Sequence, residues 1–144
     1  MPKSILLSLK KALFCFHIRV YQLTAGHVLG RVVGAPVLLL STTGRKTGRI
    51  RTWPLLYLVE GDTRVVVASN SGSPDHPSWY LNLRNNPAVT IQLGGRRLSV
   101  EARTASPTEK ALLWPKMIRM FSGYDTYQGR TRREIPVVIL KEAQ

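Results

Sequence analysis

Several residue types and patterns are scarce in this sequence of 144 residues, and each scarcity excludes a class of protein. Cys15 is the only cysteine, so no disulfide framework can form and a reducing compartment is expected. No acidic residue occurs before Glu60, although nine Lys or Arg precede it. No run reaches the roughly eighteen apolar residues that a spanning helix needs. The apolar stretch 5–9 is too short for a secretory signal.

Familiar catalytic and metal-binding patterns are missing as well. His17, His27 and His76 are scattered without a second ligand at metal spacing, so no metal site is expected. We expect His76 to be a solvated loop residue and Cys15 to be a buried structural thiol in a helix. The glycines do not form the phosphate-binding patterns of nucleotide enzymes. A chain without an acid, base or nucleophile cluster either only binds, or takes its chemistry from a cofactor.

Positive charge is abundant and unevenly distributed. The formal net charge is +13, but the chain from residue 60 onward contributes only +4, since twelve cations there face eight acids. The N-terminal excess requires an anionic partner: a phosphate, a carboxylate, a nucleic acid or a lipid headgroup. It is densest in "TTGRKTGRIR", residues 42–51, where glycines let backbone N–H groups approach a ligand and threonines add hydroxyl donors. A solvated hairpin tip is the alternative interpretation.

The apolar pattern predicts a single mainly β domain of the α+β class over residues 1–144, with residues 1–30 as a helical extension. A helix is expected over 4–23. It either packs on its own domain or lies on an anionic membrane, and both hold if only part of it docks. Its apolar residues recur every three or four positions and form one stripe: Ile5, Leu9, Leu13, Phe16, Val20 and Leu23.

About six strands follow, and their short connections favour an antiparallel barrel over a parallel sheet. Pro54 indicates an edge strand or a bulge. A short helix is expected over 79–85, and a capping box at 106–109 starts a second helix that runs to about 121. Residues 70–78 and 123–131 are expected to be loops. The predicted strands are 36–42, 51–59, 63–69, 88–93, 96–104 and 135–140.

Three stretches together resemble the deazaflavin-dependent nitroreductase family of actinobacteria: "TTGRKTGRIRTWPLLYLVEG", "VVVASNSGSPDHPSWYLNLRNNPAVTIQL" and "GYDTYQGRTRREIPVVIL". The resemblance covers residues 36–140 and implies a split β-barrel related to flavin-mononucleotide-binding oxidoreductases. It implies binding of coenzyme F-420, a deazaflavin with a phosphodiester and a polyglutamate tail, in preference to flavin mononucleotide. It also implies an oxidoreductase that passes hydride from reduced F-420 to a quinone-like, nitroaromatic or other activated acceptor.

The resemblance also implies roles for individual residues. Arg45, Lys46 and Arg51 match cations that bind the phosphodiester, and Trp79 would pack beside the deazaflavin ring. The predicted catalytic residues are Ser69, near the reactive face of the ring, and Tyr124 and Tyr127, which match tyrosines bordering the substrate pocket. The predicted cofactor-binding residues come from the first two stretches and are Thr43, Arg45, Lys46, Thr47, Gly48, Arg49, Arg51, Thr52, Trp53, Pro54, Val67, Ala68, Ser69, Asn70, Ser78, Trp79 and Asn82.

Three positions depart from the family pattern. Asn70 replaces a frequent Lys, and Ser71-Gly72 replaces Gly-Gly. Phe121 stands where some nitro-reducing members have Tyr, which argues against nitro reduction.

Two other functions remain open: an F-420- or flavin-binding carrier without turnover, and a basic nucleic-acid-binding protein. The second is weakened because the chain has no Lys/Arg-aromatic RNA motif. A cytoplasmic location is expected, with peripheral attachment to the inner face of the cell membrane as an alternative. The charge slightly favours a monomer.

Overall fold

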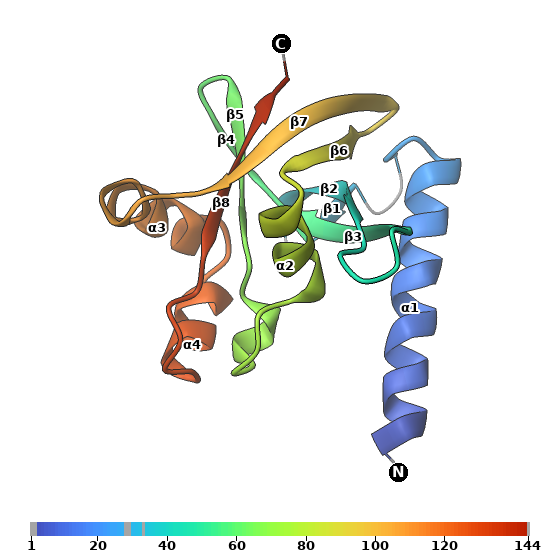
Figure 1. Ribbon diagram of the computed structural model, residues 1–144, viewed down its shortest axis with the longest axis horizontal. Coiled ribbons are helices and arrows are strands. Elements are labelled where there is room, and N and C mark those ends of the chain that lie inside the picture. Colours follow the sequence, from blue (N-terminus) through green and yellow to red (C-terminus); the bar gives the residue numbers. More distant parts are fainter. Residues whose placement is uncertain (1–2, 28–29, 33, 144) are drawn as a thin grey trace.

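A curled antiparallel sheet forms the body of the molecule, in a computed structural model that describes residues 3–27, 30–32 and 34–143 (Figure 1). The strands follow one another across the sheet as β1 (Arg31–Val32), β2 (Ala35–Thr43), β6 (Ala88–Leu93), β7 (Arg96–Thr104), β8 (Val137–Glu142), β5 (Thr63–Val67) and β4 (Leu58–Glu60). β3 (Ile50–Leu56) pairs only with β2, as expected for a strand that contains Pro54. The helical elements are α1 (Lys3–Leu23), the 3₁₀ turn η1 (Asn70–Gly72), α2 (Ser78–Asn85), α3 (Pro107–Met120) and α4 (Gly123–Gly129).

This architecture is the α+β half-barrel with an N-terminal helix that the sequence predicts, but several elements differ. The short strand β1 was not among the six expected strands. The expected strand 51–59 is divided at Tyr57, whose N–H donates to the carbonyl of Pro36. Before this residue β3 pairs with β2, and after it β4 pairs with β5. The last strand occupies 137–142 instead of 135–140. The expected loop 123–131 contains α4, which was missed because this helix is short, has glycine at both ends and lacks a repeating apolar pattern.

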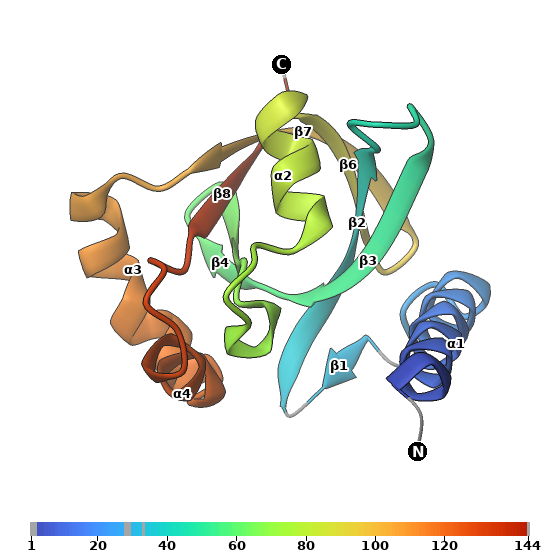
Figure 2. The ribbon, with the colours of Figure 1, turned by 60° about the horizontal axis from the view of Figure 1, so that its bottom comes forward.

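The concave face of the sheet is filled by α2, which lies inside the curve of the strands (Figure 2). Its side chains Trp79, Tyr80 and Leu83 are buried and pack with residues of the sheet such as Leu40 and Ile91. Burial of these large apolar groups stabilises the barrel and fixes the position of α2. The loop that precedes α2 is thereby held at one end of the barrel.

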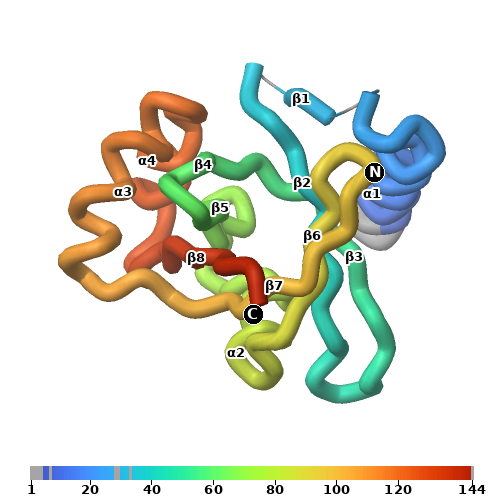
Figure 3. The backbone as a smooth tube through the Cα atoms, turned by 90° about the horizontal axis from the view of Figure 1, so that it is seen from above, coloured from blue at the N-terminus to red at the C-terminus, as the bar shows by residue number. Residues whose placement is uncertain are grey.

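α3 and α4 cover a second apolar cluster on one side of the sheet, opposite to α1 (Figure 3). The predicted capping box begins α3: Ser106 accepts from the N–H of Glu109, and the Glu109 carboxylate accepts from the N–H of Ser106. Met117 of α3 and Tyr124 of α4 are buried in this cluster against Val65 and other strand residues. The cluster fixes α4 beside the barrel.

α1 docks on the barrel through a face other than the predicted stripe. Ile18 and Tyr21 pack on β2, Phe14 lies 4.3 Å from the ring of Trp53, and the Tyr21 hydroxyl accepts from the N–H of Gly94. Cys15 is exposed, so the predicted buried thiol is wrong; it lies outside the helix face that carries Phe14, Ile18 and Tyr21. Most of the predicted stripe is exposed, by the fractions Ile5 48%, Leu9 52%, Leu13 67%, Phe16 63% and Leu23 79%.

Candidate active site

The basic stretch forms the tight hairpin between β2 and β3. The N–H of Gly44 donates to the carbonyl of Arg49 over 2.7 Å, and the N–H of Gly48 donates to the carbonyl of Gly44 over 2.8 Å. A Cβ on Gly44 would lie 2.8 Å from the Thr47 hydroxyl oxygen, so this turn requires glycine. The hairpin therefore presents a compact group of exposed cations: Arg45, Lys46, Arg49 and Arg51.

Asn82 connects this hairpin to α2. Its Oδ1 accepts from both the backbone N–H and the Nη1 of Arg45, at 3.1 Å each, and its Nδ2 donates to the Thr42 hydroxyl over 3.2 Å. Asn82 and Thr42 are both buried. A buried amide with these partners fixes the base of the hairpin and orients the Arg45 guanidinium. Asn82 thus acts on Arg45 in this structure.

The loop after β5 has an unusual backbone. Asn70 and Ser71 have left-handed φ values of 46° and 54°, and Gly72 follows at 77°. The Asn70 amide donates to the carbonyl of Asp75 over 3.0 Å and closes the loop. Gly72 lies against α4, because a Cβ there would be 2.7 Å from the carbonyl oxygen of Tyr127. The loop is therefore strained and packed directly on the tyrosine-bearing helix.

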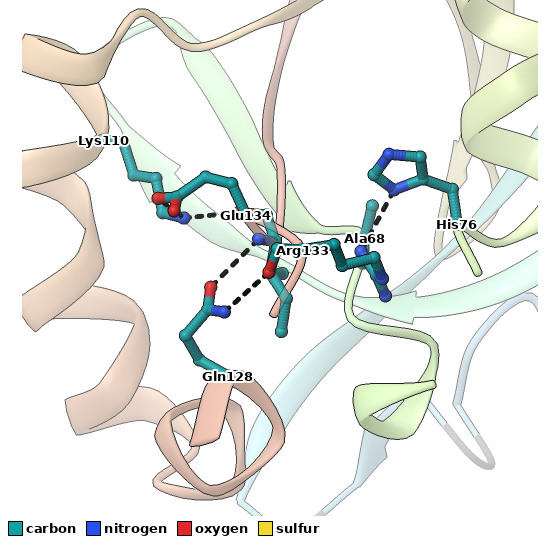
Figure 4. A network of polar contacts seen from close by, with 7 residues as sticks. Ala68, His76, Lys110, Gln128, Arg133 and Glu134 are labelled. Atoms are coloured by element: carbon teal, nitrogen blue, oxygen red, sulfur yellow. Dashed lines mark hydrogen bonds and ion pairs between the residues drawn. The ribbon is translucent and has the colours of Figure 1, made fainter. Parts of the chain in front are cut away.

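Arg133 also binds this loop, and Figure 4 shows its side chain beside Ala68 and His76. Its guanidinium donates to the carbonyls of Ser69 (2.6 Å), Ser73 (2.8 Å) and Ala68 (3.2 Å), and its Nη1 lies 3.0 Å from Nδ1 of His76. The sequence analysis assigned no role to Arg133. Its position inside the third family-like stretch was the only available signal, because sequence does not reveal that its partners are backbone carbonyls 60–65 residues away.

His76 is a member of this network, so the predicted solvated histidine is wrong. It is half-buried, and its ring centroid lies 4.9 Å from that of Tyr80. Burial lowers the pKa of His76, and the nearby Arg133 and Arg84 lower it further, while Asp75 acts in the opposite direction. A neutral ring can accept from Arg133 at Nδ1, which a protonated ring cannot do.

The two predicted catalytic tyrosines lie on α4 in different surroundings. Tyr124 is buried, with its ring edge-on to Phe121 at 5.1 Å, and Tyr127 is half-buried with the Arg130 guanidinium 5.4 Å from its ring. Burial raises the pKa of Tyr124. Among the described residues, no hydrogen bond involves its hydroxyl.

The structure brings most of the predicted site residues together. Asn82 connects the basic hairpin to α2, and Arg133 and Gly72 connect the Ser69 loop to the α4 region. The hairpin holds Thr43, Arg45, Lys46, Thr47, Gly48, Arg49 and Arg51; the loop holds Ser69 and Asn70; and Ser78 and Asn82 are on α2.

Six predicted residues make other contacts. Val67, Ala68 and Trp79 are buried in the apolar clusters, so their side chains pack the core here. The Thr52 hydroxyl bonds that of Ser41, and Trp53 stacks on α1, as described above. Pro54 stands opposite Leu39 in the sheet.

Comparison with known proteins identifies the family. A model of the F-420H(2)-dependent quinone reductase family matches residues 13–142. The chain belongs to this family. It is 43% identical over 128 residues to the F-420H(2)-dependent quinone reductase Rv1261c of Mycobacterium tuberculosis, covering 86% of each chain.

Two solved structures are similar to this F-420H(2)-dependent quinone reductase family member. One is an F-420-H2 dependent reductase, FDR-A, with a TM-score of 0.68 and 38% identity, covering 74% of this chain and 94% of that one. The other, described as a domain-swapped dimer, has a TM-score of 0.70 and 32% identity, covering 98% of this chain and 100% of that one.

Family membership confirms four predictions: the split-barrel family, the α+β fold class, an oxidoreductase activity of the quinone reductase type, and reduced F-420 as its hydride donor. The roles of the individual site residues stay predictions. In the described part of the chain, no helix is long and apolar enough to cross a membrane. The described residues contain no group of three or more His, Cys, Asp or Glu that could hold a metal ion.

Proposed function

We propose that this protein reduces a quinone with hydride from F-420H(2), with the cofactor bound along the basic hairpin, α2 and the Ser69 loop. The single observation that carries this proposal is the interlocking of the three family-like stretches through Asn82 and Arg133. These three stretches are proposed to form one wall of the site, with the hairpin cations at one end and the α4 tyrosines at the other. When bound, reduced F-420 supplies the hydride, and the chain supplies binding and orientation.

The chemistry of the hairpin fits the anionic part of F-420. Its four cations are exposed, and none of the ion pairs in the described part of the chain involves them. Guanidinium groups bind phosphate oxygens in a two-pronged manner, and Lys adds a compact charge. Asn82 holds Arg45 in place before the ligand arrives, which reduces the ordering cost of binding.

Tyr124 and Tyr127 are proposed to border the acceptor. Hydride arriving at a quinone places negative charge on a carbonyl oxygen, and a donor there lowers the barrier. The Tyr124 hydroxyl can act as such a donor. Phe121 has no hydroxyl and packs edge-on against both tyrosines, so this wall favours a flat quinone over a nitro compound that needs a further donor.

Anaerobic oxidation of F-420H(2) with menadione tests the proposal. We expect measurable turnover, and weak or no activity with bulky nitroimidazoles. Tyr124→Phe should lower kcat while F-420 affinity stays within about twofold; Tyr57→Phe, outside the proposed wall, is the matched control. Faster reduction of nitroimidazoles than of menadione would contradict the acceptor assignment. F-420 binding without turnover would favour the carrier alternative.

We also propose that α1 attaches the protein to an anionic membrane surface, where a lipid-soluble quinone would be available. The exposed apolar stripe supports this, since Leu9, Leu13 and Phe16 are each more than half exposed. Exposed Lys10, Lys11 and Arg19 lie on the same helix, and each cation near an anionic surface contributes about 1 kcal/mol.

Co-sedimentation with vesicles tests this attachment. The protein should pellet with anionic vesicles at low salt but not with neutral ones. The double change Leu9→Ser and Leu13→Ser should weaken pelleting, because it removes apolar side chains from the exposed stripe. The fold should not change, because both side chains are exposed. Equal pelleting of this variant with the parent would show that α1 is only a packing element.

A further inference from the structure

Arg133 makes most of the side-chain contacts that hold the strained loop after β5 from outside, and Arg130 adds one, from its Nη1 to the carbonyl of Ser71 over 3.5 Å. The Arg133 guanidinium donates to three carbonyls, those of Ala68, Ser69 and Ser73, and its Nη1 lies beside Nδ1 of His76. Figure 4 shows Arg133 with Ala68 and His76. The loop's own Asn70 contact closes it only between residues 70 and 75. Arg133 therefore connects both ends of the loop to the segment that precedes β8.

Arg133 is itself held in place by α4. The Gln128 amide donates to the Arg133 carbonyl over 2.8 Å and accepts from the N–H of Ile135 over 3.0 Å. Within the described residues, the Arg133 guanidinium forms no ion pair with a carboxylate. Its N–H groups donate to backbone carbonyls of the loop, which is the arrangement expected of a side chain that fixes the shape of a loop.

The same loop contacts α4 directly. Gly72 approaches the backbone of Tyr127 so closely that a Cβ would lie 3.1 Å from the Tyr127 Cα. Ser69 and Tyr127 are thus on two segments that Arg133, Gln128 and Gly72 hold together. A change at Arg133 would alter the separation of these segments without removing any group proposed to touch a ligand.

We propose that Arg133 is a positioning residue that sets the distance between the Ser69 loop and α4, and thereby the approach of the deazaflavin ring to the acceptor. This rests on the function proposed above. The reaction is sensitive to such a residue, because hydride transfer requires closely aligned reacting atoms, whereas cofactor affinity depends mainly on the distant cationic hairpin.

Arg133→Lys is the informative variant, because it keeps the charge but loses the planar fork that serves several carbonyls. We expect kcat with saturating F-420H(2) to fall at least about tenfold while the Kd for F-420 changes less than about threefold. Arg132→Lys is the matched control, since Arg132 is the exposed neighbour. It should leave both constants unchanged. His76→Asn removes one partner of Arg133 and should give a smaller fall in kcat.

Hydrogen exchange of the cofactor-free protein provides a second readout. In Arg133→Lys, the amides of residues 69–76 should exchange faster than in the parent, while those of β6 and β7 should not change. Gln128→Ala should give the same pattern more weakly, which keeps the test valid if the arginine variant folds poorly.

Unchanged exchange in the loop together with unchanged kcat would overturn the proposal. Equal losses in affinity and kcat with a general rise in exchange would also overturn it, because they indicate a purely structural role. A parent protein that neither binds nor oxidises F-420H(2) would contradict the proposed function, while the exchange measurement would still test the contacts of Arg133.

Discussion

The cations of the N-terminal part and those of the C-terminal part are used differently. After residue 60, three cations form ion pairs: Arg103 with Glu109, Lys110 with Glu134, and Lys116 with Glu60, each at 2.7 Å. None of these pairs, which are those of the described residues, involves any of the eight cations from Lys10 to Arg51. Paired cations connect elements of the fold, whereas the unpaired ones remain available for an external anion.

The difference also separates two kinds of arginine environment. Arg133 is half-buried among carbonyls, and burial lowers its pKa, whereas Arg49 is exposed at the hairpin. A group surrounded by its own protein contributes to shape, and an exposed group contributes to recognition. Four predictions test this contrast, from the largest expected effect to the smallest.

Removing two hairpin cations should have the largest effect. Each charge-assisted contact to an anion contributes about 1.5–3 kcal/mol. We therefore expect Arg45→Ala with Lys46→Ala to bind F-420 at least about a hundredfold more weakly. Titration of F-420 fluorescence measures this, with Arg96→Ala as an exposed control. Affinity should also fall with added salt; a double variant that binds as tightly as the parent would remove the hairpin from the site.

Loss of the Asn82 amide should affect both stability and binding. Asn82→Ala leaves the buried Thr42 hydroxyl and the Arg45 N–H without their partner. We expect the free energy of unfolding to fall by about 2 kcal/mol. F-420 affinity should fall less than in the double cation variant. Asn85→Ala, at an exposed position of the same helix, should change neither quantity in chemical denaturation or in cofactor titration.

The two faces of α1 should respond differently to substitution. Tyr21→Phe removes the hydroxyl that contacts Gly94 and Gln92, and should lower the free energy of unfolding by about 1 kcal/mol. Leu13→Ala on the exposed stripe should change it by no more than about 0.5 kcal/mol. A larger cost for Leu13 in dilute solution would show that the stripe is covered by another molecule.

The Glu109 carboxylate should give the smallest effect, seen as a pH dependence of stability in acid. The Arg103 guanidinium, with help from the Ser106 N–H, lowers the pKa of Glu109 from 4.5 to about 2. A pKa lowered in the folded state stabilises the protein above the unfolded value, and this stabilisation is lost as pH falls from about 4.5 to about 2. Glu109→Gln keeps an acceptor for the capping box. Thermal unfolding of this variant should lack this part of the pH dependence. A variant that loses as much stability as the parent between pH 4.5 and about pH 2 would contradict the assignment.

The sequence predicted the elements with regular patterns and missed those defined by distant contacts. Alternation and turn residues located the strands, and the 106–109 motif located the start of α3. α4 was missed because it is stabilised by burial of Tyr124 and not by its own periodicity. The roles of Arg133 and His76 depend on contacts with residues 57 or more positions away. The exposed stripe of α1 was ambiguous, because an apolar face does not identify what it contacts.

The turn between β4 and β5 is a suitable site for attaching a probe. In Figure 1 it lies at the end of the barrel opposite to η1 and α4. Gly61 and Asp62 are exposed there, and nothing lies within 4 Å of an added Gly61 Cβ. A dye or a tether attached through Asp62→Cys, with Cys15 first replaced by Ser, would leave the Ser69 loop and the cationic hairpin facing solution. Single-molecule recording of cofactor arrival could use this attachment without touching the groups it reports on.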